Sequence, residues 1–361
     1  MAQKKRRKKS KRMPKALRVC LIMLAVLAVL AVLSGVMVTL AMSGVIPSND
    51  VEDFLSDFVG EGVEKAFDKI LPNDLVDEVL APKYDDLVDF IVSLLPKPER
   101  IPLNGEIQVH FIDVGQGDSI LIMAPEGNIL IDAGPNDCED ALESYLDDLG
   151  ITTLHCVIAT HPHEDHIGSM DMIFEEFQVN TLIMPDVEKH DKGFEPTGDY
   201  TRMMEGAAEQ KTQIAYAESG TTFSLGEVHF LVVGPCGTEY GDLNDWSLVT
   251  KVTYGSTSMM LTGDAESISE KEIIAAFSDS ELDVDILKSG HHGSSSSSCS
   301  GFLDAIDPEI VVISCGEGNK YNHPNKETMD RYQERDMEIW RTDLEGSIVF
   351  VSDGASFTKL P

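Results

Sequence analysis

The sequence predicts an α/β fold: a layered sandwich over residues 101–361, preceded by one transmembrane helix and an acidic helical linker. Three observations predict this class. After Pro102, short runs of β-branched and aliphatic residues alternate with amphipathic helical stretches. Some runs are joined by tight glycine-containing turns that favour hairpins and others by helices, so the sheets should mix antiparallel and parallel pairing. Near the N-terminus, 28 consecutive residues carry no charge, and about 20 apolar residues suffice to cross a bilayer.

The first 46 residues determine the expected topology. Residues 1–18 hold ten Lys or Arg side chains and no acidic one, and the uncharged segment 19–46 follows directly. The positive-inside rule keeps the basic tail in the cytoplasm and places the rest of the chain outside. An uncleaved signal anchor is favoured over a cleaved signal peptide because the apolar segment is long, although Ala41 and Ser43 would suit a peptidase. We therefore expect a single-pass protein of the cell membrane whose main domain is extracellular.

Residues 47–100 form an acidic amphipathic segment. Between residues 51 and 70 the apolar side chains fall on one helical face, and the pattern recurs in YDDLVDFIVSLL before PKPERIP breaks it. Two interpretations stay open: a helical stalk that self-associates through residues 47–95, or helices packed on the main domain.

The main domain, residues 101–361, should begin with three strands. They are expected at 107–114, 119–125 and 128–134, joined by GQGD and EGN turns. A helix at 141–150, closed by Gly150, then precedes a buried strand at 154–160. Further strands are expected at 180–185, 227–233, 247–254, 258–264, 282–290, 309–316 and 346–352, with helices near 201–217, 266–277 and 325–335. The serine run at 294–299 should be a short flexible loop.

The charge of the chain argues against one class of function. Residues 19–361 carry 18 Lys or Arg against 62 Asp or Glu, a net charge of −44, so this part of the chain should not bind nucleic acid through a broad basic groove. A phosphate-containing substrate would have to be held by bound cations or local dipoles. The five cysteines after residue 46 are scattered without a Cys-x-x-Cys pair, which indicates free thiols rather than a disulfide framework.

Histidines and carboxylates are concentrated in THPHEDHIG, residues 160–168. His161 and His163 stand two residues apart, and the pair Asp165 and His166 follows. Imidazole nitrogens and carboxylate oxygens are the usual ligands of zinc and similar ions. Because α/β proteins build sites at the carboxyl ends of strands, later strand ends should supply the remaining ligands. The suitable stretches are SMMLTGDAE with Asp264, DVDILKSGHHGS with His291 and His292, and NKYNHP with His323.

The order of the motifs FIDVGQGDSILI, NILIDAG, ATHPHEDHIG, NDWSLV, LTGDAE and LKSGHHGS resembles the metallo-β-lactamase superfamily, specifically the extracellular hydrolase domain of ComEC-type competence DNA-uptake channels. The multi-helix channel of true uptake proteins has no counterpart here, so we expect a stand-alone, membrane-tethered relative. The resemblance covers about residues 105–358. It implies a four-layer αβ/βα sandwich with two divalent metal ions, Zn or Mn, at one edge. It also implies that His161 and His163 hold the first ion, that Asp165, His166 and His291 hold the second, that Asp264 bridges both, and that Asp132 orients a ligand from behind.

One stretch departs from the usual superfamily pattern. Where most members supply another histidine to the first ion, NDWSLV offers Asn244 and Ser247, as the ComEC-type branch does. The first site should then be richer in oxygen, bind its ion less tightly and tolerate manganese as well as zinc. Alternatively, Asn244 and Ser247 hold a substrate phosphate oxygen. In DVGQGDS, the resemblance places Asp113, Gln116 and Asp118 near the metal edge, behind the ligands or as structural residues.

The expected reaction is metal-assisted hydrolysis. A hydroxide bridged by the two ions would attack phosphorus or a carbonyl carbon, with Asp165 or Asp264 accepting a proton and His323 or His292 donating one to the leaving oxygen. The first hypothesis is a membrane-anchored extracellular phosphodiesterase or nuclease, with single-stranded DNA as one candidate substrate. The alternatives are a hydrolase of a cell-envelope ester or phosphodiester, on teichoic acid or lipid, and a non-catalytic surface binding protein.

Overall fold

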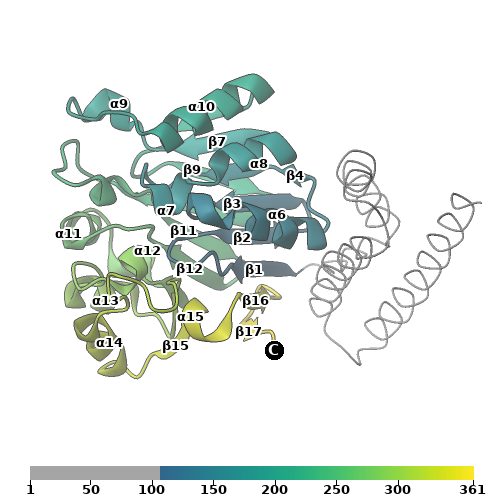
Figure 1. Cartoon of the computed structure of the whole chain (residues 1–361). Coiled ribbons are helices and arrows are strands. Elements are labelled where there is room, and N and C mark those ends of the chain that lie inside the picture. Colours follow the sequence, from purple (N-terminus) through teal and green to yellow (C-terminus); the bar gives the residue numbers. More distant parts are fainter. Residues whose placement is uncertain (1–105) are drawn as a thin grey trace, which may run out of the picture. The chain divides into compact units, whose positions relative to one another are not determined.

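The computed structural model describes residues 106–361, which are coloured in Figure 1. The basic tail, the transmembrane anchor and the linker expected at 1–18, 19–46 and 47–100 lie outside the described residues, and they stay predictions. Within the described range, no helix is both long enough and apolar enough to cross a membrane.

The first of two mixed sheets has eight strands in the order β17-β16-β1-β2-β3-β5-β7-β8. Strands β1 to β3 pair as antiparallel hairpins, as the turn motifs predict, and β5, β7 and β8 continue the sheet in parallel. Beyond β1, strands β16 and β17 add antiparallel pairs. The bounds are β1 Ile107–Phe111, β2 Ile120–Ala124, β3 Gly127–Ile131, β5 Cys156–Ile158, β7 Thr181–Met184, β8 Gln213–Tyr216, β16 Ile348–Ser352 and β17 Phe357–Lys359.

The second sheet has seven strands in the order β15-β14-β13-β12-β11-β10-β9. Strands β9 to β12 are antiparallel neighbours, whereas β12 to β15 run parallel. Their bounds are β9 Thr222–Leu225, β10 Val228–Gly234, β11 Val249–Tyr254, β12 Thr257–Leu261, β13 Ile286–Lys288, β14 Ile310–Ile313 and β15 Glu338–Arg341. A small separate pair joins β4 (Thr153–Leu154) to β6 (Gln178–Val179).

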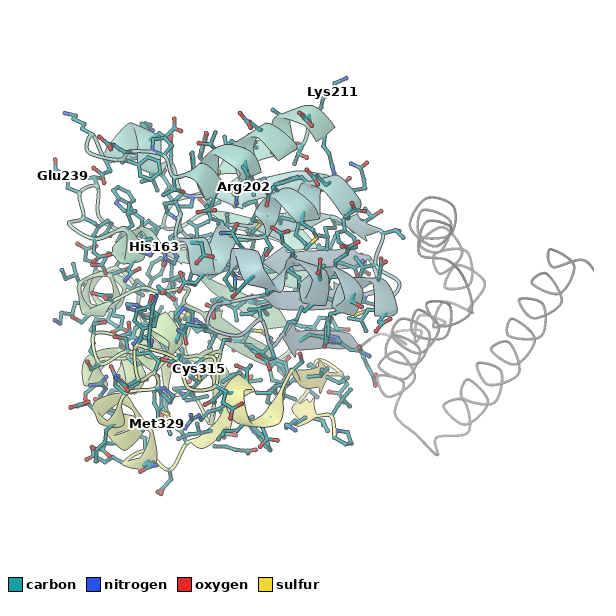
Figure 2. All side chains as sticks on the ribbon, viewed as in Figure 1. His163, Arg202, Lys211, Glu239, Cys315 and Met329 are labelled. Atoms are coloured by element: carbon teal, nitrogen blue, oxygen red, sulfur yellow. The ribbon has the colours of Figure 1, made fainter. Side chains whose placement is uncertain are left out.

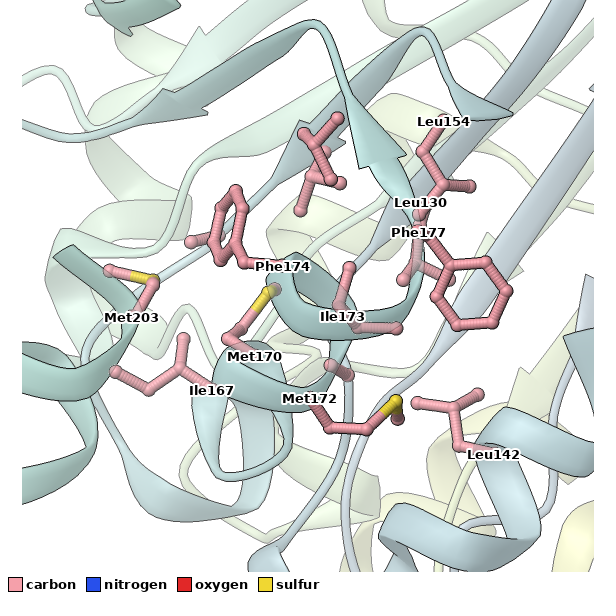
Figure 3. Packing of buried hydrophobic residues seen from close by; sticks show 14 of the residues in the cluster. Leu130, Leu142, Leu154, Ile167, Met170, Met172, Ile173, Phe174, Phe177 and Met203 are labelled. Atoms are coloured by element: carbon pink, nitrogen blue, oxygen red, sulfur yellow. The ribbon is translucent and has the colours of Figure 1, made fainter. Parts of the chain in front are cut away.

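Three buried apolar clusters show that the fold has four layers. One cluster draws side chains from both sheets, including Ile122 and Val312, and fills the space between them. A second packs α6 (Glu139–Asp148), α8 (Met170–Glu176) and α10 (Gly198–Gln210) on the first sheet (Figure 3). A third packs α11 (Ser267–Ala276), α13 (Ser300–Ile306) and α14 (Lys326–Gln333) on the second sheet. The mixed α/β sandwich expected from the sequence is therefore confirmed.

Short helices and turns complete the described part of the chain. They are η3 (Asn136–Cys138), α7 (Glu164–Ile167), α9 (Val187–His190), η4 (Leu243–Trp246), α12 (Asp279–Leu282), η5 (Gly290–Gly293) and α15 (Thr342–Glu345). All five cysteines of this range are free, and Cys138, Cys156 and Cys315 are buried, which agrees with the expected free thiols.

Two local expectations were wrong. Helix α10 ends at Gln210 rather than near residue 217, because Lys211 adopts a left-handed conformation with φ of 61° and the chain continues into β8. The serine run at 294–299 is not a loose loop, since side chains of α11 and α14 hold it. Glu270 accepts the Cys299 N–H at 2.8 Å, Arg331 donates to the Ser297 carbonyl at 2.8 Å, and the Tyr332 hydroxyl lies 2.6 Å from Ser298 Oγ.

Candidate metal centre

The candidate centre lies where the carboxyl ends of strands from both sheets meet. Asp132 follows β3, the THPHEDHIG loop follows β5, Asp264 follows β12, and the two adjacent histidines follow β13. The Leu248 N–H donates to the Thr160 carbonyl at 3.0 Å and so joins the second sheet to this loop. Figure 2 shows the side chains on the ribbon, with His163 labelled beside α7. The shared edge brings together residues that are more than a hundred positions apart in the sequence.

Four side chains converge on one point: Asp165, His166, Asp264 and His292. One ligand atom from each lies within 4.8 Å of all the others. His166 Nε2 is 3.1 Å from Asp264 Oδ1, and His292 Nε2 is 3.4 Å from Asp264 Oδ2 and from Asp165 Oδ2. Three of the four residues are almost fully buried, and Asp165 is partly exposed.

Asp132 holds His166 from behind. Its Oδ2 lies 2.7 Å from His166 Nδ1, while Thr160 donates to both carboxylate oxygens, its N–H at 2.8 Å and its hydroxyl at 2.7 Å. A histidine that donates Nδ1–H to a carboxylate presents the lone pair of Nε2 on its other side. Asp132 is fully buried and has φ of 58°, an uncommon backbone conformation for a residue other than glycine. The local fold thus aims His166 Nε2 into the cluster.

His292 rather than His291 points into the four-residue cluster. The Nδ1 atom of His292 lies 3.0 Å from the Ser314 carbonyl, which leaves Nε2 free to face Asp264. His291 is 24% exposed, with Nδ1 3.1 Å from Glu266 Oε1 and Nε2 3.6 Å from Asp264 Oδ2. Both histidines have positive φ, 47° and 54°, so the chain turns sharply here and directs the second side chain inward.

The pair His161 and His163 stands beside this cluster. His161 Nε2 lies 3.0 Å from His163 Nδ1, and the rings of His161 and His166 are 4.2 Å apart between centroids. Burial, followed by the nearby charge of His166, lowers the pKa of His161 well below its usual value. His161 is therefore a neutral imidazole, the form that binds metals.

The NDWSLV stretch runs along the same edge. Ser247 is fully buried, and its Oγ accepts the Asp264 N–H at 3.0 Å, so it fixes the backbone of Asp264. The alternative role as a phosphate ligand does not fit this buried Ser247. Asn244 Nδ2 lies 3.4 Å from His291 Nδ1 and 3.4 Å from Glu266 Oε1, near the more open side of the cluster.

Of the residues in the DVGQGDS turn that were expected near the metal edge, Asp118 reaches the cluster and Asp113 does not. Asp113 is exposed, and its Oδ1 accepts the Gly115 N–H within the turn at 3.1 Å. Asp118 instead reaches the cluster, with Oδ1 3.4 Å from His292 Nδ1. Burial alone would raise the pKa of Asp118, but the charges of Lys288 and His292 hold it below its usual value.

Lys288, the last residue of β13, is the site residue that the sequence reasoning missed. It is completely buried, forms an ion pair with Asp118, and its Nζ donates to the Gly263 carbonyl at 3.2 Å. A lone charged side chain at the end of an apolar strand was the available signal, because lysine is almost never fully buried without a partner.

The donor atoms of the cluster fit a divalent cation. Within residues 106–361, His166 Nε2, His292 Nε2 and Asp264 Oδ1 are buried without a hydrogen-bond partner. An unsatisfied buried polar atom costs about 1–3 kcal/mol, and a cation held among these three atoms would offset that cost. Burial disfavours the charged form of His166, yet Asp264 and Asp132 raise its pKa well above the usual value. The carboxylates that favour a proton on His166 would equally favour a divalent cation in its place, since imidazole and carboxylate groups are usual metal ligands.

A four-layer αβ/βα sandwich with a His/Asp cluster at the carboxyl ends of its strands defines a metal-dependent hydrolase. Residues 112–317 match the family model described as "Metallo-beta-lactamase superfamily", and the chain belongs to this superfamily.

Relatives connect the chain with competence proteins. It is 30% identical over 266 residues to ComE operon protein 3 of Bacillus subtilis, covering 69% of this chain and 33% of that protein. It is also 30% identical over 258 residues to Competence protein ComA of Neisseria gonorrhoeae, covering 70% of this chain and 33% of the relative. The chain therefore spans about a third of the length of these curated relatives. The crystal structure of YhfI, a metallo-beta-lactamase fold protein of Bacillus subtilis, aligns with a TM-score of 0.45 at 14% identity, covering 68% of this chain and 100% of YhfI.

Proposed function

We propose that this chain is a membrane-anchored extracellular phosphodiesterase or nuclease that uses two divalent ions, Zn or Mn. The observation that supports it most is the convergence of Asp165, His166, Asp264 and His292, whose ligand atoms lie within 4.8 Å of one another beside the His161–His163 pair. Similarity to proteins named for competence favours a nucleic-acid diester among the substrates. The membrane anchor at 19–46 and self-association through 47–95 are parts of this proposal that rest on the sequence alone.

In this proposal, His161 and His163 would hold the first ion, Asp264 would bridge both, and His292 would take the place that sequence gave to His291 in the second site. The geometric reason is that His292 Nε2 is buried and unpaired, while His291 is partly exposed and pairs with Glu266. Bound divalent ions would lower the pKa of a water and stabilise the charge that develops on the phosphoryl group.

The chain's own residues would do the positioning. Asp132 and Ser247 fix His166 and Asp264, so the ligand atoms are in place before substrate arrives. His323 lies at the partly exposed side, with its ring 5.4 Å from that of His291. Burial and the charges of His291 and His292 lower its pKa to about 4, which disfavours the proton-donor role expected from sequence.

A second candidate is a hydrolase of a cell-envelope phosphodiester. The net charge of −44 beyond residue 18 repels long polyanions and favours a small or locally bound substrate. The two candidates share the metal site and differ in the group attached to the phosphate.

The test is metal content of the full-length protein, followed by turnover of bis(p-nitrophenyl) phosphate and of single-stranded DNA with added Zn or Mn. The matched variants are His292→Ala and His291→Ala. We expect the first to lose one bound ion and metal-dependent turnover, and the second to retain both ions. Circular dichroism and thermal melting of each variant show whether it folds. Wild-type protein with no bound metal and no metal-dependent turnover would contradict the enzyme proposal. Cleavage of the small diester but not of DNA would favour the envelope candidate.

A further inference from the structure

A column of three aromatic rings leads from the metal cluster towards the solvent. The ring of buried His292 is stacked on that of His323, with 6.3 Å between centroids and 28° between planes. His323 is in turn stacked on Tyr321, at 5.6 Å and 23°. Tyr321 is 50% exposed, so the outermost ring of the column is accessible to a ligand.

The loop that carries Tyr321 and His323 is ordered by its own hydrogen bonds. Asn319 Oδ1 accepts the N–H groups of Tyr321 at 3.2 Å and His323 at 2.9 Å, and its Nδ2 donates to the carbonyls of Gly316 and His323. Asn322, which follows Tyr321, has φ of 58° and so turns the chain sharply before His323. Because one side chain fixes the loop from within, little conformational entropy would be lost when a ligand stacks on Tyr321.

A positive charge accompanies the exposed ring. Lys320 Nζ lies 4.9 Å from the centroid of the Tyr321 ring, and Lys320 is exposed on a flexible stem. The ammonium group can therefore leave the ring face for a nearby phosphate. The chain is strongly acidic, so Lys320 supplies a local positive charge beside an aromatic ring at the metal edge.

We propose that Tyr321 and Lys320 form a binding platform for a nucleotide next to the scissile phosphate, with the base stacked on Tyr321 and Lys320 on a neighbouring phosphate. This inference rests on the proposed phosphodiesterase function and names its substrate class: nucleotidyl diesters and single strands with exposed bases. A duplex hides its base faces in the stack, whereas every unpaired base offers one to an aromatic side chain.

The platform also distinguishes the two candidate functions. A glycerol phosphate or ribitol phosphate polymer has no flat group to stack, so Tyr321 would contribute little to its binding. Loss of one base–aromatic stack weakens binding by at least about fivefold, and this effect should fall on KM.

The experiment compares two esters in the metal-loaded full-length protein. One is thymidine 5′-(p-nitrophenyl phosphate), and the other is the same ester with hydrogen in place of thymine. We expect wild type to favour the thymidine ester by about fivefold or more in kcat/KM, through a lower KM. Tyr321→Ala should abolish this preference and Tyr321→Trp should retain it. Tyr216→Ala is the matched control, because Tyr216 is a similarly exposed tyrosine, 52%, on β8 of the other sheet.

A binding measurement separates failure of this inference from failure of the proposed function. Fluorescence anisotropy compares a labelled ten-nucleotide thymidine strand with an abasic strand of equal length, which requires no turnover. Tighter binding of the thymidine strand that disappears in Tyr321→Ala would support the platform even if wild type hydrolyses no diester. Equal preference in wild type and Tyr321→Ala, in hydrolysis or in binding, would overturn the platform. If the platform is overturned but wild type hydrolyses both esters, the phosphodiesterase proposal stands without the platform.

Discussion

Replacing Lys288 by Met should strongly destabilise the domain. Lys288 is completely buried, and its Nζ contacts both Asp118 and the Gly263 carbonyl. Met fills a similar volume without the charge, so Asp118 keeps its buried carboxylate and loses its cation. Removing one partner of a buried ion pair costs about 3–5 kcal/mol. For a domain of this size, each 1 kcal/mol lowers the melting temperature by about 2–4 °C, so we expect a decrease of about 10 °C.

The assay is urea and thermal unfolding in the presence of a chelator, so that bound metal does not mask the effect. The double variant Lys288→Met/Asp118→Asn should be more stable than Lys288→Met alone, because it no longer buries an uncompensated charge. Lys326→Met is the matched control. Lys326 pairs with Asp330 on the surface at 2.6 Å, and its loss should leave the melting temperature nearly unchanged. The reasoning is refuted if Lys288→Met is as mild as Lys326→Met, or if the double variant is the least stable of the set.

Three further measurements test other parts of the structure. Burial raises the pKa of Glu270 to about 7, so the folded state retains a proton that the unfolded state releases. The free energy of unfolding should therefore fall as pH rises from about 4.5 to 7. Glu270→Gln should remove this decline in urea unfolding, and an unchanged dependence on pH would contradict the raised pKa. Burial lowers the pKa of His110 to about 4, so stability should fall as pH drops from about 6.5 towards 4. His110→Gln should flatten that limb, and a steeper one would count against a buried neutral imidazole. Ser247→Ala removes the hydrogen bond to the Asp264 N–H. Metal affinity should then fall about 10- to 100-fold in a competition assay with a chromophoric chelator. Unaltered affinity would show that Ser247 does not position Asp264.

The sequence predicted the architecture well because it depends on patterns that are local. The GQGD and EGN turns indicated hairpins, and the apolar runs indicated strands whose carboxyl ends meet. The helix expected to reach residue 217 ends before Lys211. A left-handed cap at a residue other than glycine cannot be recognised from the sequence.

The site was harder to predict in detail because it depends on the directions in which individual side chains point. Two histidines in succession look equivalent in GHHG, and only their backbone angles decide that His292 faces Asp264 while His291 faces Glu266. The serine run suggested flexibility by composition alone. Its order comes from Glu270 and Arg331, which are near it only in the folded chain.

The meeting of two sheets at the metal cluster has a consequence for how the domain persists. Residues 161–166 belong to the first sheet's edge, and Asp264 and His292 to the second, so neither half of the domain holds a complete ligand set. An ion bound there would link the two halves, and its contribution to the free energy of unfolding would grow with the logarithm of the free ion concentration. The folded fraction of the domain should therefore depend on the metal supply of its surroundings, independently of whether a substrate is present.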